Sequence, residues 1–204
     1  DVIKQGGGND MGLNMSTAGR YTFVMRDVDY TNTQFYVGYT SNAPVTVSRT
    51  GQTFSGGGAV ISIATGATPS SGENVYVRYR SGTNDFTSST SVVQATGSGT
   101  SWSATIPSLS CGTTYYYYVY TSTRTLSQIN GDNEINRSLA ALRYDDAFGS
   151  NYSFTASPIT AGITNNSGST LLTCSLTSIG VTATGGDSYS WDNGLGNSAN
   201  ASIT

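Results

Sequence analysis

Histidine is absent from the 204 residues of this chain, and its absence excludes several kinds of active site. Ser-His-Asp and Cys-His catalytic groups both need the imidazole as the base that takes the proton of the nucleophile. Most zinc sites depend on histidine as well. Two kinds of polar site remain, namely a pair of carboxylates of the glycosidase type and a calcium site built from oxygen ligands.

Charge is also scarce, because only 10% of the residues are charged, against about a quarter in an ordinary soluble domain. Lys4 is the single lysine, and the arginines are scattered. No basic stripe is available to neutralise phosphates, so nucleic acid is not expected as a partner. No apolar run approaches the length of a membrane span, so membrane insertion is not expected either. Low charge with dense hydroxyl side chains predicts a secreted or extracellular cell-surface protein.

Only two cysteines are present, Cys111 and Cys174. They neither prove nor exclude an oxidising compartment, and their spacing leaves open whether they pair. A chain of this length can bury a stable core without disulfides or metals. Asp1 does not resemble a start and no signal peptide precedes the first strand, so we expect a mature or excised piece of a longer protein.

Short β-forming stretches separated by Gly, Ser, Asn and Pro dominate the chain, which contains 25 glycines. Their recurrence every 10–15 residues or so predicts a β-sandwich over residues 41–157. Its central strand is the tyrosine-rich stretch 109–120. Alternation divides this strand into a core face and an opposite face. The core face has Tyr115, Tyr117 and Val119, and the opposite face has Tyr116, Tyr118 and Tyr120.

The sequence outside that sandwich predicts two incomplete β units. Residues 1–40 contain two strands, 19–26 and 34–39, that read as a hairpin, and a lone hairpin is marginal in water. It therefore has to join a sheet, either in the next domain or outside this chain. Residues 158–204 contain four further strand-like stretches, 170–175, 178–183, 188–191 and 201–204. They predict the first half of a second sandwich, since a complete one needs roughly 100 residues.

One stretch has helical rather than strand-like spacing. Ile135, Leu139 and Leu142 recur at i, i+4 and i+7 within 133–143, which predicts one short helix in an insertion around 132–143. We expect this helix to lie over one end or edge of the sandwich.

The tyrosine-rich strand resembles the fibronectin type III pattern Leu-x-x-Gly-Thr-x-Tyr-x-x-x-Val. The matching residues are Leu109, Gly112, Thr113, Tyr115 and Val119. The resemblance implies that Tyr115 is the tyrosine-corner residue. It also implies an all-β fold, a fibronectin III/Ig-like β-sandwich with one short helix, followed by a partial second Ig-like sandwich.

Longer stretches resemble modules of large secreted proteins of Bacteroidota, many of which the type IX secretion system exports. The stretches that carry this resemblance are 73–79, 104–107, 112–117 and 149–154, with 170–174, 183–186 and 189–194 in the Ig-like tail. The resemblance implies a piece of a multidomain surface protein, either an adhesin or the non-catalytic part of a glycan-degrading enzyme. It makes Trp191 a core tryptophan and gives Cys174 a local partner that this chain does not contain.

Acidic clusters are the candidates for a metal or catalytic site. The weak calcium candidates are Asp132 with Glu134 and Asp145 with Asp146, together with Asp27 and Asp29. Solvated turn residues are the favoured interpretation, because Asp and Asn form turns on their own account. Glu73 and Glu134 could supply a glycosidase pair, but no pattern places two carboxylates across a cleft. We therefore predict no catalytic residues, no enzyme activity and no required cofactor.

Aromatic side chains are the candidates for ligand contact, because a ring face can stack on a sugar. Trp102 shares the parity of Ala104 and Ile106 and is expected in the core. Tyr116, Tyr118 and Tyr120 are the better candidates for contact with a ligand, although cover by the 121–148 segment is the favoured interpretation for them.

Two functions follow as hypotheses. The first is a non-catalytic structural or adhesive module of a long surface protein or fibre. Its partners would be neighbouring domains or identical subunits, joined by exchange of strands at unpaired edges. The alternative is a carbohydrate-binding accessory domain of a secreted glycan-degrading enzyme, with glycans as the partner.

Overall fold

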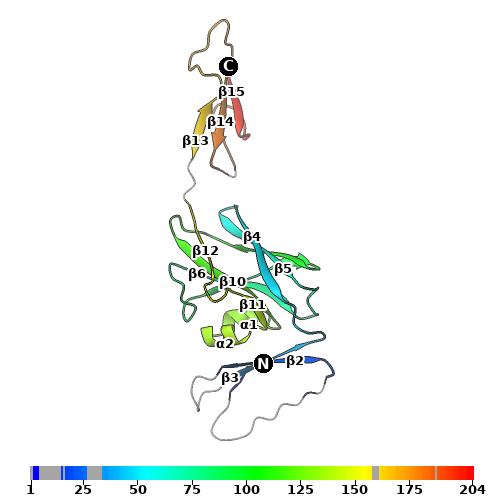
Figure 1. The fold of residues 1–204 in the computed structure, drawn as a ribbon. Coiled ribbons are helices and arrows are strands. Elements are labelled where there is room, and N and C mark those ends of the chain that lie inside the picture. Colours follow the sequence, from blue (N-terminus) through cyan, green and yellow to red (C-terminus); the bar gives the residue numbers. More distant parts are fainter. Residues whose placement is uncertain (1, 5–14, 16, 27–33, 158–160, 187) are drawn as a thin grey trace. The chain divides into compact units, whose positions relative to one another are not determined.

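The structure is a computed structural model, and it describes residues 2–4, 15, 17–26, 34–157, 161–186 and 188–204. The chain divides into two compact units, Asp1–Ala156 and Ser157–Thr204, which are taken one at a time below. The fold is all-β with short helices, as the sequence predicts (Figure 1).

Two antiparallel sheets form the centre of the first unit in the manner of a β-sandwich. The first sheet has the order β4 (Val47–Ser55), β5 (Gly58–Thr65), β9 (Ser101–Ile106) and β8 (Thr96–Ser98). The second has the order β11 (Arg143–Asp145), β10 (Thr114–Ser122), β6 (Asn74–Ser81) and β7 (Ser91–Gln94), with β12 (Tyr152–Thr155) also paired to β10. Alternate residues of both sheets share one core, which includes Ile61, Val77 and Tyr117. The sandwich therefore arises from the period-2 pattern of its strands.

The tyrosine-rich strand β10 has the predicted core face, since Tyr115, Tyr117 and Val119 are buried between the sheets. The Tyr115 hydroxyl accepts a hydrogen bond from the backbone N–H of Ser110 at 2.9 Å. Most of the opposite face is buried too: Tyr118 is 9% exposed and Tyr120 is fully buried, whereas Tyr116 is half-buried. Tyr118 and Tyr120 both belong to a second apolar cluster. This cluster includes Ile129 and Ala141 of residues 125–142, which are called the helical segment below.

The helical segment contains a helix within the predicted range 133–143, but that helix is shorter than expected, and a second helix precedes it, so the expectation of a single helix is wrong. Helix α1 spans Leu126–Gly131 and begins at Thr125, whose side chain forms a capping box with Gln128. Helix α2 spans Glu134–Leu139 and is capped by Asn133. It ends early because the chain turns back onto the sheet. The N–H of Leu142 donates to the carbonyl of Thr121, and β11 then pairs with β10.

A three-stranded sheet precedes the sandwich, with the order β1 (Val2–Lys4), β3 (Gln34–Thr40) and β2 (Arg20–Arg26). Strands β2 and β3 pair antiparallel over the two stretches expected to form a hairpin, and β1 adds a third strand. Tyr36 of this sheet is buried against Leu139, Ala140 and Leu142. The helical segment therefore packs on the sandwich through one apolar cluster and on the N-terminal sheet through another.

The second unit is one antiparallel sheet with the order β13 (Gly162–Asn165), β14 (Ile179–Thr184) and β15 (Asn200–Ile203). Two of the strands expected here, 170–175 and 188–191, are bends and irregular backbone instead. Hydroxyl side chains explain the first difference, because Ser169 bonds the N–H of Leu171 and Thr173 bonds that of Leu176. Such local bonds compete with pairing in a sheet.

Candidate functional site

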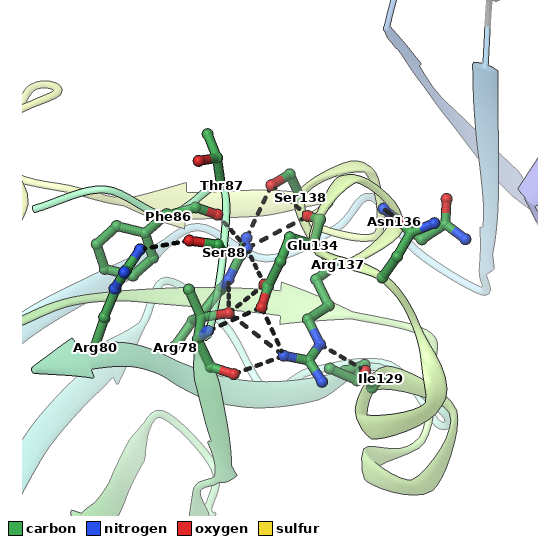
Figure 2. A network of polar contacts seen from close by, with 12 residues as sticks. Arg78, Arg80, Phe86, Thr87, Ser88, Ile129, Glu134, Asn136, Arg137 and Ser138 are labelled. Carbon is green, nitrogen blue, oxygen red and sulfur yellow. Dashed lines mark hydrogen bonds and ion pairs between the residues drawn. The ribbon is translucent and has the colours of Figure 1, made fainter.

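The most extensive polar network of the described residues is centred on Arg78, in the middle of β6 (Figure 2). Arg78 is fully buried, on the face of its sheet that the helices cover. Its Nε donates to Thr90 Oγ1 at 2.9 Å, and its Nη1 donates to Tyr118 Oη at 2.9 Å and to Ser138 Oγ at 2.8 Å. Its Nη2 lies 2.7 Å from Glu134 Oε2. A buried guanidinium is tolerated because each of its nitrogens has an acceptor.

Glu134 is the acidic partner of this network and lies in the first turn of α2. Its carboxylate accepts from the backbone N–H of Thr90 at 2.8 Å, and a short contact joins it to the Thr90 hydroxyl. Arg137 Nη1 lies 3.3 Å away on the other side. Burial opposes ionisation of Glu134, but the hydrogen bonds from Thr90 and from Arg78 outweigh it and lower the pKa of the carboxyl below its ordinary value.

Arg137 and Arg124 extend the network over the helices. Arg137 donates from Nη1 to the carbonyl of Thr90 at 2.6 Å and from Nε to that of Ile129 at 2.9 Å. Arg124 pairs with Asp132 at 2.8 Å. These bonds connect β6, the residue before β7, α1 and α2. Together they form a brace that attaches the helical segment to the sheet.

The four predicted calcium candidates occupy three separate places. Asp132 pairs with Arg124, and Glu134 belongs to the Arg78 network. Asp145 accepts from the backbone N–H of Arg49 and from the Tyr152 hydroxyl, and Asp146 accepts from the N–H of Gly149. Within the described ranges, no three Asp, Glu, Cys or His side chains converge on a common point. Asp27 and Asp29 lie outside the described residues.

Glu73 and Glu134, considered above as a glycosidase pair, serve different parts of the fold. Glu73 is buried and accepts from the backbone N–H groups of Val45 and Ser70. It fixes the loop before β6, whereas Glu134 fixes the start of α2. Both carboxylates therefore have structural partners.

The predicted aromatic contact residues differ in accessibility. Tyr116 is half-buried, and it lies opposite Arg80 on β6 and Ser153 on β12. Tyr118 and Tyr120 are buried beneath the helical segment, so their ring faces are not offered to a ligand. Burial raises the pKa of Tyr118; the Arg78 guanidinium opposes the rise, and the nearby Glu134 and Asp146 carboxylates add to it.

A cavity of about 270 Å³ lies beside the Arg78 network. It is lined by Tyr118, Ser138, Ala141, Tyr144, Asp146 and Asn151. Tyr144 and Asn151 were not among the predicted site residues. The sequence carries one signal for Tyr144, an aromatic residue directly before two aspartates in a segment that is otherwise poor in aromatics.

The remaining sequence candidates are at exposed or partly exposed positions. Cys111 lies in the first unit and Cys174 in the second, and both are exposed free thiols in the described part of the chain. Trp102 is partly buried against the sandwich core, as expected. Trp191 is half-buried, and its Nε1 donates to the carbonyl of Ser198 at 2.7 Å.

None of the helices within the described ranges is long and apolar enough to cross a membrane. Comparison with protein-family models, curated proteins and solved structures finds no match to this chain.

Proposed function

We propose that this chain is a non-catalytic structural and adhesive module of a secreted or cell-surface protein, of the kind the Bacteroidota resemblance implies. The observation that carries the proposal is how the buried charges are used. Arg78, Glu134 and Arg137 bind one another and the backbone, and they connect elements of the fold. Glu73 serves the backbone in the same way. These contacts stabilise the fold, and they bring no carboxylate pair to a cleft.

The bond between the Tyr115 hydroxyl and the N–H of Ser110 supports a fibronectin III-like first unit. In a tyrosine corner, the phenol bonds back to the backbone a few residues upstream. Gly112, in the turn between these residues, has a φ of +74°, which favours glycine. For the second unit, we propose an Ig-like fold.

The sheet of the second unit provides the means of assembly in this proposal. Its outer strands β13 and β15 each pair with β14 alone among the strands of the described residues. Ile163 on β13 is 70% exposed and Ile203 on β15 is 42% exposed. Open edges with apolar side chains recruit strands from neighbouring chains. Identical subunits or neighbouring domains are therefore the proposed partners.

Two matched substitutions test assembly through the strand edge. Ile163→Lys places a charge on β13, whereas Leu171→Lys changes a residue that is 72% exposed and lies outside the strands. We expect the unaltered chain to associate as its concentration rises. We expect Ile163→Lys to reduce the association and Leu171→Lys to leave it unchanged. Analytical ultracentrifugation and electron microscopy measure the association of each chain.

Two results would contradict the proposal. If the unaltered chain stayed monomeric throughout, or if both lysine variants behaved alike, the edge of β13 would not mediate assembly. Hydrolysis of a glycoside by the chain, lost in Glu73→Gln, would contradict its non-catalytic character.

A further inference from the structure

The cavity beside the Arg78 network has a wall built from four parts of the fold. Tyr118 comes from β10, Ser138 from α2 and Tyr144 from β11, and the loop after β11 adds Asp146 and Asn151. Its volume of about 270 Å³ lies just below the range of about 300–1,000 Å³ that is typical of pockets for drug-sized ligands. The cavity therefore suits a single ring rather than an extended ligand.

Sheet register explains why these side chains meet. Tyr120 pairs with Tyr144 between β10 and β11, so residues two positions from each, Tyr118 and Asp146, belong to the same face. The loop that follows is closed by its own backbone, because the N–H of Asn151 donates to the carbonyl of Asp146 at 2.6 Å. Asn151 adopts a φ of +54° at this point.

The inner wall of the cavity is held in place before any ligand arrives. Tyr118 Oη and Ser138 Oγ both accept hydrogen bonds from Nη1 of the buried Arg78. Ser138 also donates to the carbonyl of Glu134 at 3.0 Å. Wall groups fixed in this way lose little conformational freedom on binding.

Several polar atoms at the cavity keep capacity for a ligand. Asp146 Oδ1 accepts from the N–H of Gly149 at 2.9 Å, whereas Oδ2 has no hydrogen-bond partner among the described residues. Asn151 Nδ2 donates to Asn84 at 2.8 Å, so its carbonyl oxygen remains an acceptor. Tyr118 accepts from Arg78, so its own hydroxyl hydrogen can be donated.

The outer part of the cavity provides an aromatic surface. The Tyr144 side chain is 62% exposed, although the residue lies in a strand and is paired through its backbone. A ring face of this kind packs against the C–H face of a ligand ring while the phenol oxygen stays in water.

We propose that this cavity binds one ring of a neutral saccharide. The C–H face of the sugar packs on Tyr144, and its hydroxyl groups donate to Asp146 and Asn151 and accept from Tyr118. An anionic ligand is disfavoured, because Asp146 would repel it and the nitrogens of Arg78 are all engaged by protein acceptors. An organic cation would be attracted by Asp146, so it is the competing ligand that the test has to separate from a saccharide.

The test is a titration of the whole ¹⁵N-labelled chain, followed by amide chemical shifts. The probes are the methyl glycosides of glucose, galactose, mannose and N-acetylglucosamine, with tetramethylammonium as the cationic probe. We expect at least one glycoside to shift the amides of residues 144–151. Tyr144→Ala should weaken its binding about tenfold, the size expected for loss of one aromatic contact. Asp146→Asn, which keeps the size of the side chain, should weaken binding as well.

Phe148→Ala is the matched control, because Phe148 is a fully exposed aromatic residue close in sequence that does not line the cavity. The Phe148→Ala variant should bind the glycoside as tightly as the unaltered chain does. The amide spectrum of each variant shows whether that variant is folded. Three results would overturn the proposal. These are no shift with any glycoside, binding that is unchanged in both Tyr144→Ala and Asp146→Asn, or binding of tetramethylammonium in place of the glycosides.

Discussion

Removing the charge of Glu134 gives the sharpest test of the brace between the helical segment and the sheet. In Glu134→Gln, the side chain keeps its size and can still accept from the N–H of Thr90. It no longer neutralises Arg78, whose side chain is fully buried, whereas that of Glu134 is 17% exposed. Leaving a buried charge without its partner typically costs about 3–5 kcal/mol. The partial exposure of Glu134 favours the lower end, so we expect a loss of about 3 kcal/mol in the free energy of unfolding.

That loss is large enough to measure in a unit of this size. For a domain of about 150 residues, it corresponds to a fall in Tm of roughly 6 to 12 °C. Urea unfolding followed by Trp102 fluorescence, in a Trp191→Phe background, reports on the first unit alone. The control is Asp85→Asn, because Asp85 pairs with Arg80 at an exposed site and its removal should have a far smaller effect.

A second substitution distinguishes an unpaired charge from simple loss of contacts. Adding Arg78→Met to Glu134→Gln removes the guanidinium that has lost its partner. The double variant should therefore lose less free energy of unfolding than the sum of the losses in the two single variants. If Glu134→Gln destabilised the unit no more than Asp85→Asn, the brace would not hold the helical segment in place and the reasoning would be refuted.

Three further predictions follow from the same contacts. The pKa of Glu134 is lowered in the folded chain, so its contribution to stability is complete above the ordinary carboxyl value near 4.5 and is lost as pH falls through the folded pKa. In Glu134→Gln, the free energy of unfolding in urea should therefore fall less steeply as the pH is lowered through this range. Burial raises the pKa of Tyr76 to about 12, with a further contribution from Tyr36. The stability that Tyr76 provides is complete below the ordinary value of 10 and declines between pH 10 and about 12, where the free energy of unfolding measured in urea should fall. Asn133→Ala removes the cap of α2 and should cost about 1 kcal/mol in urea unfolding, with Asn130→Ala, which caps neither helix, as the control.

Much of the first unit could be predicted from its pattern. Alternation placed Tyr115, Tyr117 and Val119 in the core because a strand points successive side chains to opposite faces, whatever packs against them. The same rule could not say what covers Tyr118 and Tyr120, since their cover comes from other parts of the chain, which include Ile129 of α1 and Val92 of β7.

Helix length was predicted less well, and the reason lies outside the helix. The spacing of Ile135, Leu139 and Leu142 is helical, yet α2 ends at Leu139. Pairing of the next segment with β10 competes with continuation of the helix, and no local pattern expresses that competition.

The sequence by itself determined the all-β class, the longer strands of the sandwich and the exclusion of histidine chemistry, because these depend on residue types and on local periodicity. Only the tertiary structure decided the role of Arg78. By alternation it belongs to the face directed away from the core, and the fold buries that face under α2 and places Glu134 against its guanidinium. The cavity at Tyr144 was decided in the same way, since its wall joins strands, a helix and a loop. Local periodicity shows which face of a strand or helix is apolar, but it does not show which distant segment packs against that face.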